Sequence, residues 1–303
     1  MASSIVGMVV PKAFGSNPET ASTNSFQGEG VTSDVGQMAQ SEAERMADQL
    51  DRSGVDVRVF QDDPALSLPD AVFPNNWVST HGDDGLVLYP MLSPNRRRER
   101  RGEIIQQLVT EFGLSNIHNF AVHELSDQFL EGTGSLVLDR ERKIAYAALS
   151  ARTHIDLVEE WCDIYGYRAV PFFTQDRQRL PIYHTNVVMG LGHGMCAICL
   201  WSVQSGKYRD DLTESLDGLE VIDLSPQQME AFAGNWLALQ SLRGEPLGVF
   251  SSTAWYALGA HQKAKIEARM SPVVVEIPTI EKVGGGSARC MLLEIYPASS
   301  FAR

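Results

Sequence analysis

The sequence predicts an α/β fold, because helical patterns and short apolar runs alternate from one end of the chain to the other. The clearest strand is residues 55–60, in which valines alternate with charged residues. The clearest helix starts are Ser93-Pro94 and Ser225-Pro226, each a serine N-cap followed by a first-turn proline. About five helices, each set among several short strands, suggest five structural units, although no repeat is visible in the sequence itself.

The expected elements follow from these patterns. Strands are expected at residues 5–10, 55–60, 85–89, 135–138, 144–148, 169–173, 186–189, 195–201, 248–251, 273–277 and 290–295. Helices are expected at residues 33–53, 93–112, 151–165, 225–242 and 252–269, the last broken near Gly259. The loops are short and there is no low-complexity linker, so we expect one catalytic domain over residues 1–303.

Composition excludes several classes of function. The 303 residues are 44% hydrophobic, which is enough for a large core, and the formal charge of −13 argues against nucleic acid or an anionic membrane as partner. The basic residues 96–101 are interpreted as one helix face that pairs with carboxylates. No apolar run reaches the roughly 20 residues that span a bilayer, and residues 1–6 do not resemble a signal peptide, so a cytoplasmic protein is expected.

The four cysteines indicate neither a disulfide framework nor a zinc site. Cys196 and Cys199 lie in an apolar run that reads as a buried strand, where residues three apart face opposite sides and cannot easily hold one metal. The glycine-rich stretches 190–194 and 284–286 match neither the dinucleotide nor the phosphate-loop spacing. No metal and no cofactor are therefore expected.

Four segments place reactive or polar residues beside glycine or at a strand end: residues 68–77, 130–135, 183–186 and 284–290. Cys290 follows the glycine-rich turn and enters an apolar strand. A thiol is a useful nucleophile only as thiolate, so it needs a lowered pKa or a neighbouring base. A lone cysteine is more often a small buried hydrophobe, and a lone histidine a core residue. The combination of the four segments is what favours catalysis.

That combination resembles the guanidino-group-modifying (pentein) superfamily, which contains arginine deiminases, dimethylarginine dimethylaminohydrolases, amidinotransferases and dihydrolases. By this resemblance Cys290 is the nucleophile, His184 the acid/base, and Glu131 the carboxylate that orients the histidine, although the family's Gly-Gly-Asp is here Gly-Thr-Gly. The resemblance also implies a five-bladed α/β propeller of ββαβ modules, with the active site at its centre.

The resemblance extends to substrate-binding residues. The stretch Leu68-Pro-Asp-Ala-Val-Phe73 matches the dimethylarginine hydrolases, but their following Glu-Asp is replaced here by Asn75-Asn76. Arg96 and Arg152 match the arginines that hold the substrate carboxylate in that family. The whole set is most similar to citrulline-utilisation hydrolases (citrulline ureidases), which share Phe-Pro-Asn-Asn-Trp, Leu-Glu-Gly-Thr-Gly-Ser and Tyr-His-Thr-Asn.

Asn76 and Asn186 stand where arginine-directed relatives place carboxylates. A guanidinium has only donors and a permanent charge, which suits carboxylates, whereas a neutral ureido group offers both an acceptor and donors, which suits amides. The substitutions therefore favour citrulline over arginine. Two alternatives stay open: asparagines also cap turns, and arginine dihydrolases of the same superfamily carry asparagine at the first position.

The sequence thus predicts a hydrolase that converts citrulline to ornithine, carbon dioxide and ammonia through an intermediate bound to Cys290. The rival functions are an arginine deiminase or dihydrolase, a dimethylarginine hydrolase, an amidinotransferase and a non-catalytic amino-acid sensor. The expected partner is a small amino-acid substrate, and a homo-oligomer is compatible with the sequence.

Overall fold

The structure is a computed structural model that describes residues 2–28 and 34–301. Its strands form five sheets of three strands each. In every sheet the first two strands are antiparallel, and the third, which follows a helix, is parallel to the second. The same β-β-α-β order therefore occurs five times.

The sheets have the following members. They are β15 (Leu293–Glu294), β1 (Ile5–Val10) and β2 (Asp56–Gln61); β3 (Val78–Thr80), β4 (Leu86–Leu88) and β5 (Ile117–Asn119); β6 (Val137–Asp139), β7 (Ile144–Leu149) and β8 (Arg168–Phe173); β9 (Met189–Gly192), β10 (Met195–Ile198) and β11 (Glu220–Asp223); and β12 (Leu237–Gln240), β13 (Pro246–Ser251) and β14 (Ser271–Val275).

Each sheet has its own outer helix. In the same order these are α1 (Val35–Arg52), α2 (Gly102–Phe112), α4 (Ile155–Tyr165), α6 (Lys207–Ser215), and the pair α8 (Ser252–Ala257) and α9 (Ala260–Glu267). Shorter helices are α3 (Gly132–Ser135), α5 (Thr185–Val188), α7 (Pro226–Glu230) and α10 (Pro278–Gly284), with 3-10 turns η1 (Pro64–Leu66), η2 (Pro74–Asn76), η3 (Gly82–Asp84), η4 (Pro94–Glu99), η5 (Phe120–Ser126), η6 (Leu200–Ser202) and η7 (Ala288–Met291). Within the described ranges, no helix combines the length and the apolar character needed to cross a bilayer.

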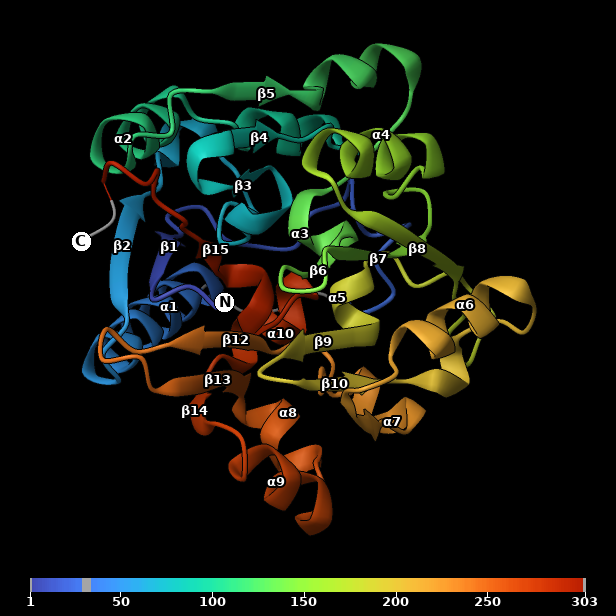
Figure 1. Ribbon diagram of the computed structural model, residues 1–303. Helices are drawn as coiled ribbons and strands as arrows, with labels where there is room; N and C mark the ends of the chain where they lie inside the picture. Colours follow the sequence, from blue (N-terminus) through green and yellow to red (C-terminus); the bar gives the residue numbers. More distant parts are fainter. Residues whose placement is uncertain (1, 29–33, 302–303) are drawn as a thin grey trace.

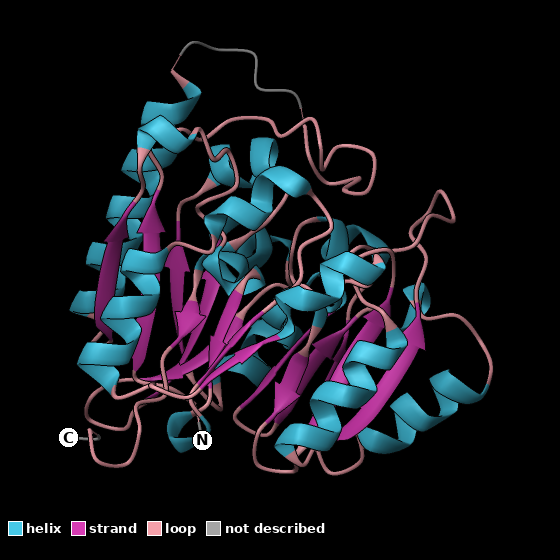
Figure 2. Cartoon of the chain, turned by 90° about the horizontal axis from the view of Figure 1, so that it is seen from above, coloured by secondary structure: helices cyan, strands magenta, loops and turns pink. Residues whose placement is uncertain are grey.

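The five sheets surround a common centre, with their first strands inside and their helices at the periphery (Figure 1). Figure 2 shows the strands of neighbouring sheets side by side, with helices packed outside them. This arrangement is the five-bladed α/β propeller that the family resemblance implies, and each sheet is one blade.

The last strand of the chain completes the blade that the first strand begins. Val6 and Gly7 of β1 pair with Glu294 and Leu293 of β15 in antiparallel register. Cys290 lies three residues before β15, so the pairing that closes the ring also fixes the height of Cys290 along the central axis.

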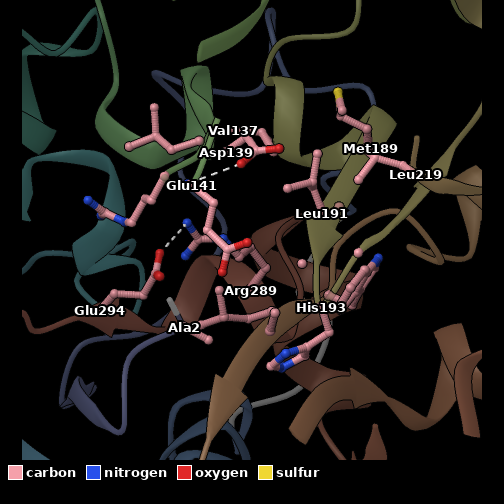
Figure 3. Close-up of a pocket in the computed structure, with 18 of the residues that line it drawn as sticks. Ala2, Val137, Asp139, Glu141, Met189, Leu191, His193, Leu219, Arg289 and Glu294 are labelled. Atoms are coloured by element: carbon pink, nitrogen blue, oxygen red, sulfur yellow. Dashed lines mark hydrogen bonds and ion pairs between the residues drawn. The ribbon is translucent and has the colours of Figure 1, made fainter. Parts of the chain in front are cut away.

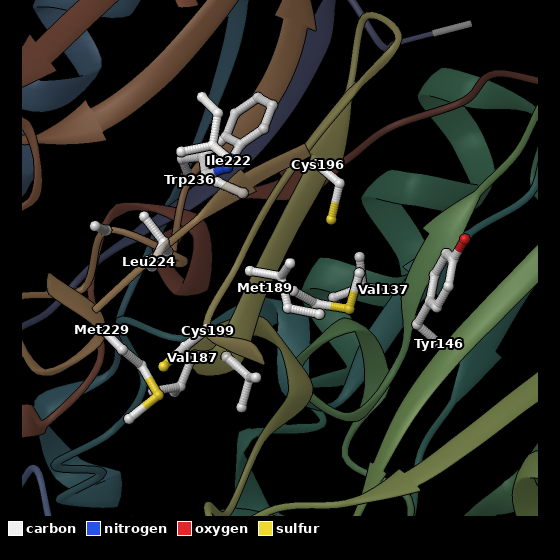
Figure 4. Close-up of a cluster of buried hydrophobic side chains, with 14 of the residues drawn as sticks. Val137, Tyr146, Val187, Met189, Cys196, Cys199, Ile222, Leu224, Met229 and Trp236 are labelled. Carbon is white, nitrogen blue, oxygen red and sulfur yellow. The ribbon is translucent and has the colours of Figure 1, made fainter. Parts of the chain in front are cut away.

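Buried apolar side chains fill the spaces between blades. One cluster joins the blades of β7, β10 and β12 and contains Cys196 and Cys199, both without exposed surface (Figure 4). The two thiols pack as small hydrophobic groups, as expected from the apolar run in which they occur.

The expected helix at 225–242 is wrong over most of its length. The serine N-cap predicted at Ser225-Pro226 is present and forms a capping box with Gln228, but α7 ends at Glu230 and β12 begins at Leu237. Phe232 takes a left-handed backbone conformation that stops the helix, and Gly234 then packs against the backbone of α5. Apolar spacing alone could not separate these two elements. The blade helix that was missed, α6, is largely polar and lacks a clear apolar stripe.

Three other expectations also differ in detail. The helix at 93–112 is interrupted at Arg100 and Arg101, and Ser93 makes no capping bond. The strands expected at 186–189 and 290–295 begin as single helical turns, α5 and η7. The short strands β3, β5, β11 and β12 were not predicted. Ser33, the expected start of the first helix, lies outside the described residues.

Close packing between blades provides a test of the fold. A Cβ added at Gly192 of β9 would lie 2.1 Å from the Cβ of Ala238 of β12, so Gly192→Ala should destabilise the protein by about 1–3 kcal/mol. Urea denaturation measures the change. Gly102→Ala is the matched control, because its Cβ would meet nothing within 4 Å at the start of α2, and it should be neutral or slightly stabilising. Equal stabilities of the two variants would contradict the packing described here.

Candidate active site

The candidate site is built from the segments that immediately precede the first strand of each blade. These segments converge at the centre of the propeller (Figure 1). They carry Asn75 and Asn76 before β3, Glu131 before β6, His184 and Asn186 before β9, Asn235 before β12, and Cys290 before β15. Because the blades repeat the same topology, residues far apart in sequence are brought to one point.

Cys290 lies where these segments meet and is almost fully buried. Its Sγ is 3.4 Å from Nδ2 of Asn186 and 3.2 Å from Nδ2 of Asn235, so two side-chain amides donate to the sulfur. Burial raises the pKa of the Cys290 thiol, and the hydrogen bonds from Ser287, Asn235 and Asn186 oppose that rise. Burial dominates, so the pKa of Cys290 lies above its ordinary value, and the hydrogen bonds together with the charge of Arg289 limit the rise.

His184 and Glu131 form a buried pair, with Nε2 of the histidine 2.8 Å from Oε2 of the carboxylate. A carboxylate only accepts, so Nε2 carries the proton and Nδ1 is the nitrogen left for proton transfer. Both His184 and Cys290 line the same cavity. The pair has the base and orienting groups that a cysteine nucleophile needs.

The charges of this pair follow from burial and neighbouring arginines. Burial lowers the pKa of His184 to about 4, although Glu131 opposes the effect, so the imidazole is neutral near pH 7 in the empty site. For Glu131, burial is outweighed by Arg152, His184 and Arg96, which hold its pKa well below the usual range. An ionised carboxylate beside a neutral imidazole favours the arrival of a proton on His184 during a reaction.

The two arginines expected to hold a carboxylate both line the cavity, but their donors already have protein partners. Arg96 forms a bidentate pair with Glu99 at 2.8 and 2.9 Å and also donates to Oδ1 of Asn76 at 3.0 Å. Arg152 donates to Thr23 at 2.7 Å and lies 3.4 Å from Glu131.

The adjacent residues Asn75 and Asn76 differ in whether they line the cavity. Asn76 lines the cavity, and because Oδ1 faces a guanidinium that can only donate, its Nδ2 must point elsewhere. Among the described residues Nδ2 of Asn76 has no hydrogen-bond partner. Asn75 does not line the cavity, and its Nδ2 donates to Thr133 at 3.3 Å.

Glycines allow these side chains to approach one another. A Cβ at Gly134 would lie 2.5 Å from Nδ2 of Asn76 and 2.8 Å from the ring of His184. Gly284 and Gly286 of the glycine-rich turn pack against the ring of Phe73, where a Cβ would come within 3.0 Å. The glycine-rich stretches predicted to mark the site are therefore required by close packing around it.

Sequence reasoning missed three contributions. Asn235 was placed within a helix. Asp70 belongs to the matched Leu-Pro-Asp stretch but was given no role, although it lines the cavity, its Oδ1 has no partner among the described residues, and burial raises its pKa. The segment containing Thr20 and Asn24 also lines the cavity, and no motif marked it.

The cavity between these residues is small, with a volume of about 10 Å³, which is room for about one water molecule. Eight residues are expected at the site. The cavity is lined by Asn76, Arg96, Arg152, His184 and Cys290, and Asn186 contacts the sulfur of Cys290. Glu131 and Asn75 do not line the cavity, but Glu131 contacts His184. In the described part of the chain, no three His, Cys, Asp or Glu side chains are grouped so that they could hold a metal ion.

Five ββαβ blades around a common centre are the pentein fold, and the family match over most of the chain places it in the guanidino-group-modifying superfamily. More narrowly, residues 10–297 match the sequence profile of the family described as N,N dimethylarginine dimethylhydrolase, eukaryotic, and the chain belongs to that family. No curated protein sequence matches the chain.

Solved structures share the fold at low sequence identity. The N-terminal domain of ArgZ, an arginine dihydrolase from the ornithine-ammonia cycle in cyanobacteria, was determined with bound substrate and has a TM-score of 0.76 at 16% identity, with 97% of this chain and 98% of that domain covered. Full-length ArgZ has a TM-score of 0.74 at 17% identity, and this chain spans only 40% of it. A dimethylarginine dimethylaminohydrolase that carries an S-methyl-L-thiocitrulline adduct has a TM-score of 0.64 at 14% identity, with 97% and 99% covered.

The buried His184 makes stability depend on pH. Its pKa is lowered from 6.5 to about 4 in the folded protein, so the unfolded chain binds a proton first, and stability should fall as the pH drops from about 6.5 to about 4. At about pH 5 this amounts to about 2 kcal/mol. The low pKa of Glu131 extends the loss to lower pH.

Urea denaturation at about pH 7 and about pH 5 measures this effect. His184→Gln should lose less stability between the two pH values than the wild type does. His261→Gln changes an exposed histidine and should keep the wild-type dependence. An unchanged dependence in His184→Gln would show that the buried imidazole does not titrate as described.

Proposed function

We propose that the protein is a citrulline hydrolase that releases ornithine, carbon dioxide and ammonia, with Cys290 as nucleophile, His184 as acid/base and Glu131 as the group that orients His184. The observation that carries the proposal is the fixed orientation of two buried amides at the site. Among the described residues, one of these amides has a nitrogen donor without a partner, and the other has an oxygen acceptor without a partner.

The free donor is Nδ2 of Asn76, because the oxygen of that amide is held by Arg96. The free acceptor is Oδ1 of Asn186, because the nitrogen of that amide donates to the sulfur of Cys290, and Oδ1 has no partner among the described residues. A ureido group has a carbonyl that accepts from Asn76 and an amino group that donates to Asn186. A guanidinium has no acceptor, so Nδ2 of Asn76 would stay unpaired, at a cost on the order of 1–3 kcal/mol.

Arg152 is the better candidate for the substrate α-carboxylate. Its shortest contact is to the neutral hydroxyl of Thr23, which a carboxylate would replace with a stronger, charge-assisted bond. Arg96, paired with Glu99, orients Asn76 and adds positive charge to the cavity. Asp70 has a free carboxylate oxygen for the α-ammonium group.

The proposed reaction begins when Cys290 transfers its thiol proton to His184 as the sulfur attacks the ureido carbon. The imidazolium, stabilised by Glu131, then protonates the nitrogen that leaves as ammonia, and a thiocarbamate remains on the sulfur. His184 next accepts a proton from water, which attacks the same carbon. The C–S bond breaks, the thiol is restored, and the released carbamate decomposes to ornithine and carbon dioxide. Each step conserves atoms and protons, and positioning of the ureido carbon beside the sulfur supplies much of the acceleration.

A second candidate is arginine dihydrolysis on the same residues. The unpaired carboxylate oxygen of Asp70 beside the cavity favours it, since a buried anion attracts a cationic substrate. The fold shared with ArgZ, named as an arginine dihydrolase, supports it as well. Both candidates use Cys290 in the same way and differ in the group first attacked.

The first experiment measures ammonia and ornithine released from citrulline, arginine, methylarginines and agmatine. Citrulline should be the best substrate, and Cys290→Ser should lower its turnover by several orders of magnitude, because the covalent step is lost. Cys196→Ser is the matched control at a buried thiol away from the site and should retain turnover. Near-normal turnover in Cys290→Ser would exclude the covalent mechanism, and arginine as the better substrate would favour the second candidate.

The second experiment tests the amide argument. Asn76→Asp removes the free donor and adds a charge that attracts guanidinium, so the ratio of kcat/KM for citrulline to that for arginine should fall by about ten- to a hundredfold, or about 1–3 kcal/mol. Asn75→Asp is the control, since Asn75 does not line the cavity, and it should change the ratio less. If both activities of Asn76→Asp fell by the same factor, Asn76 would have only a structural role.

A further inference from the structure

Four of the five blades place a residue of the proposed mechanism just before their first strand. The fifth blade has Asn235 at that position. Asn235 precedes β12 by two residues, just as Asn76 precedes β3, and Cys290 precedes β15 by three. Asn235 is fully buried and contacts the sulfur of Cys290.

We propose that Asn235 is a further catalytic residue, whose side-chain amide donates a hydrogen bond to the sulfur of Cys290 and stabilises it as a thiolate. The proposal rests on the proposed nucleophilic role of Cys290. It assigns to the fifth blade a function that neither the family resemblance nor the sequence patterns indicated.

The orientation of the Asn235 amide is fixed by groups on both sides. Its Oδ1 accepts from the backbone N–H of Arg289 at 3.1 Å, and that N–H can only donate. Its Nδ2 donates to the backbone carbonyl of Asn186 at 2.9 Å, which can only accept. The same Nδ2 lies 3.2 Å from Sγ of Cys290, and so the atom that faces the sulfur is a donor.

This geometry serves both forms of the cysteine. In the thiol form the S–H can donate to Oδ1 of Asn235, 3.6 Å from the sulfur. After the proton leaves, Nδ2 donates to the negative sulfur, and no atom of Asn235 has to move. Asn186 also donates to the sulfur, at a longer 3.4 Å, but its free oxygen faces the substrate side in the proposed function. Asn235 is thus the donor that substrate binding need not disturb.

The surroundings hold Asn235 in place before the reaction. Its own N–H donates to the carbonyl of Phe232 at 2.8 Å, and Gly234 allows the turn to pack directly on the backbone of α5. Arg289, which holds the amide oxygen, is itself anchored in a second cavity by a 3.0 Å ion pair with Glu294 (Figure 3). Preorganised donors of this kind stabilise developing charge without reorganisation.

The test follows the ionisation of Cys290 directly, by its rate of alkylation with iodoacetamide across a range of pH. Mass spectrometry locates the adduct on Cys290. In Asn235→Ala the midpoint of the rate profile should move up by about one pH unit, and alkylation near pH 7 should slow about tenfold, because a hydrogen bond to the thiolate is lost. Asn235→Asp is nearly isosteric and keeps an acceptor for Arg289. It should shift the profile at least as far, because it places a negative charge beside the sulfur.

Ser202→Ala is the control for loss of a buried hydrogen bond, since its hydroxyl donates to the carbonyl of Cys199, away from the site, and it should keep the wild-type profile of Cys290. Profiles of both Asn235 variants that coincide with the wild type would overturn the proposal, even if turnover fell. The assay needs no substrate, so a shifted profile in an enzyme that does not hydrolyse citrulline would support the role of Asn235 and reject the proposed function instead.

Discussion

The antiparallel pairing of β15 with β1 is the interaction on which the rest of the structure depends. It joins the last strand of the chain to the first, so that five blades close into a ring. Without it, the strand that follows Cys290 would have no partner, and the sulfur would not be held against the asparagines of two other blades. Ring closure therefore couples the global fold to the position of one atom.

A second constraint is the burial of charge at the centre of the ring. Arg96, Arg152, Glu99, Asp70 and Glu131 are all nearly inaccessible to solvent, which is costly unless each charge has a partner. They satisfy one another almost completely. Among the described residues, unpaired polar atoms remain on Asn76 and Asp70, which line the cavity together with Cys290, and on Asn186, whose amide contacts the sulfur. Buried polar atoms without a partner are uncommon, and these three lie where a ligand would enter in the proposed function.

The fivefold repeat of the blade explains why no single segment of the sequence identifies the site. Each blade contributes one or two polar residues from a single turn before a strand, and the turns share a position in the fold but little sequence. Cys290, His184 and Glu131 could be named because a family resemblance marked all three. Asn235 had no such mark and lay inside an apolar pattern that reads equally well as helix, so its place was hidden until the left-handed turn at Phe232 was seen.

The sequence by itself determined the α/β class, most of the longer strands and helices, and the buried role of Cys196 and Cys199, because apolar periodicity and caps are local signals. It determined a candidate set of site residues through the family resemblance of four motifs. It did not determine the short strands β3, β5, β11 and β12, the break at Arg100, or the blade helix α6. Only the tertiary structure decided that Arg96 holds the oxygen of Asn76, and that Asn186 and Asn235 touch the sulfur of Cys290. These contacts join residues that are 20, 104 and 55 positions apart, and no local pattern carries that information.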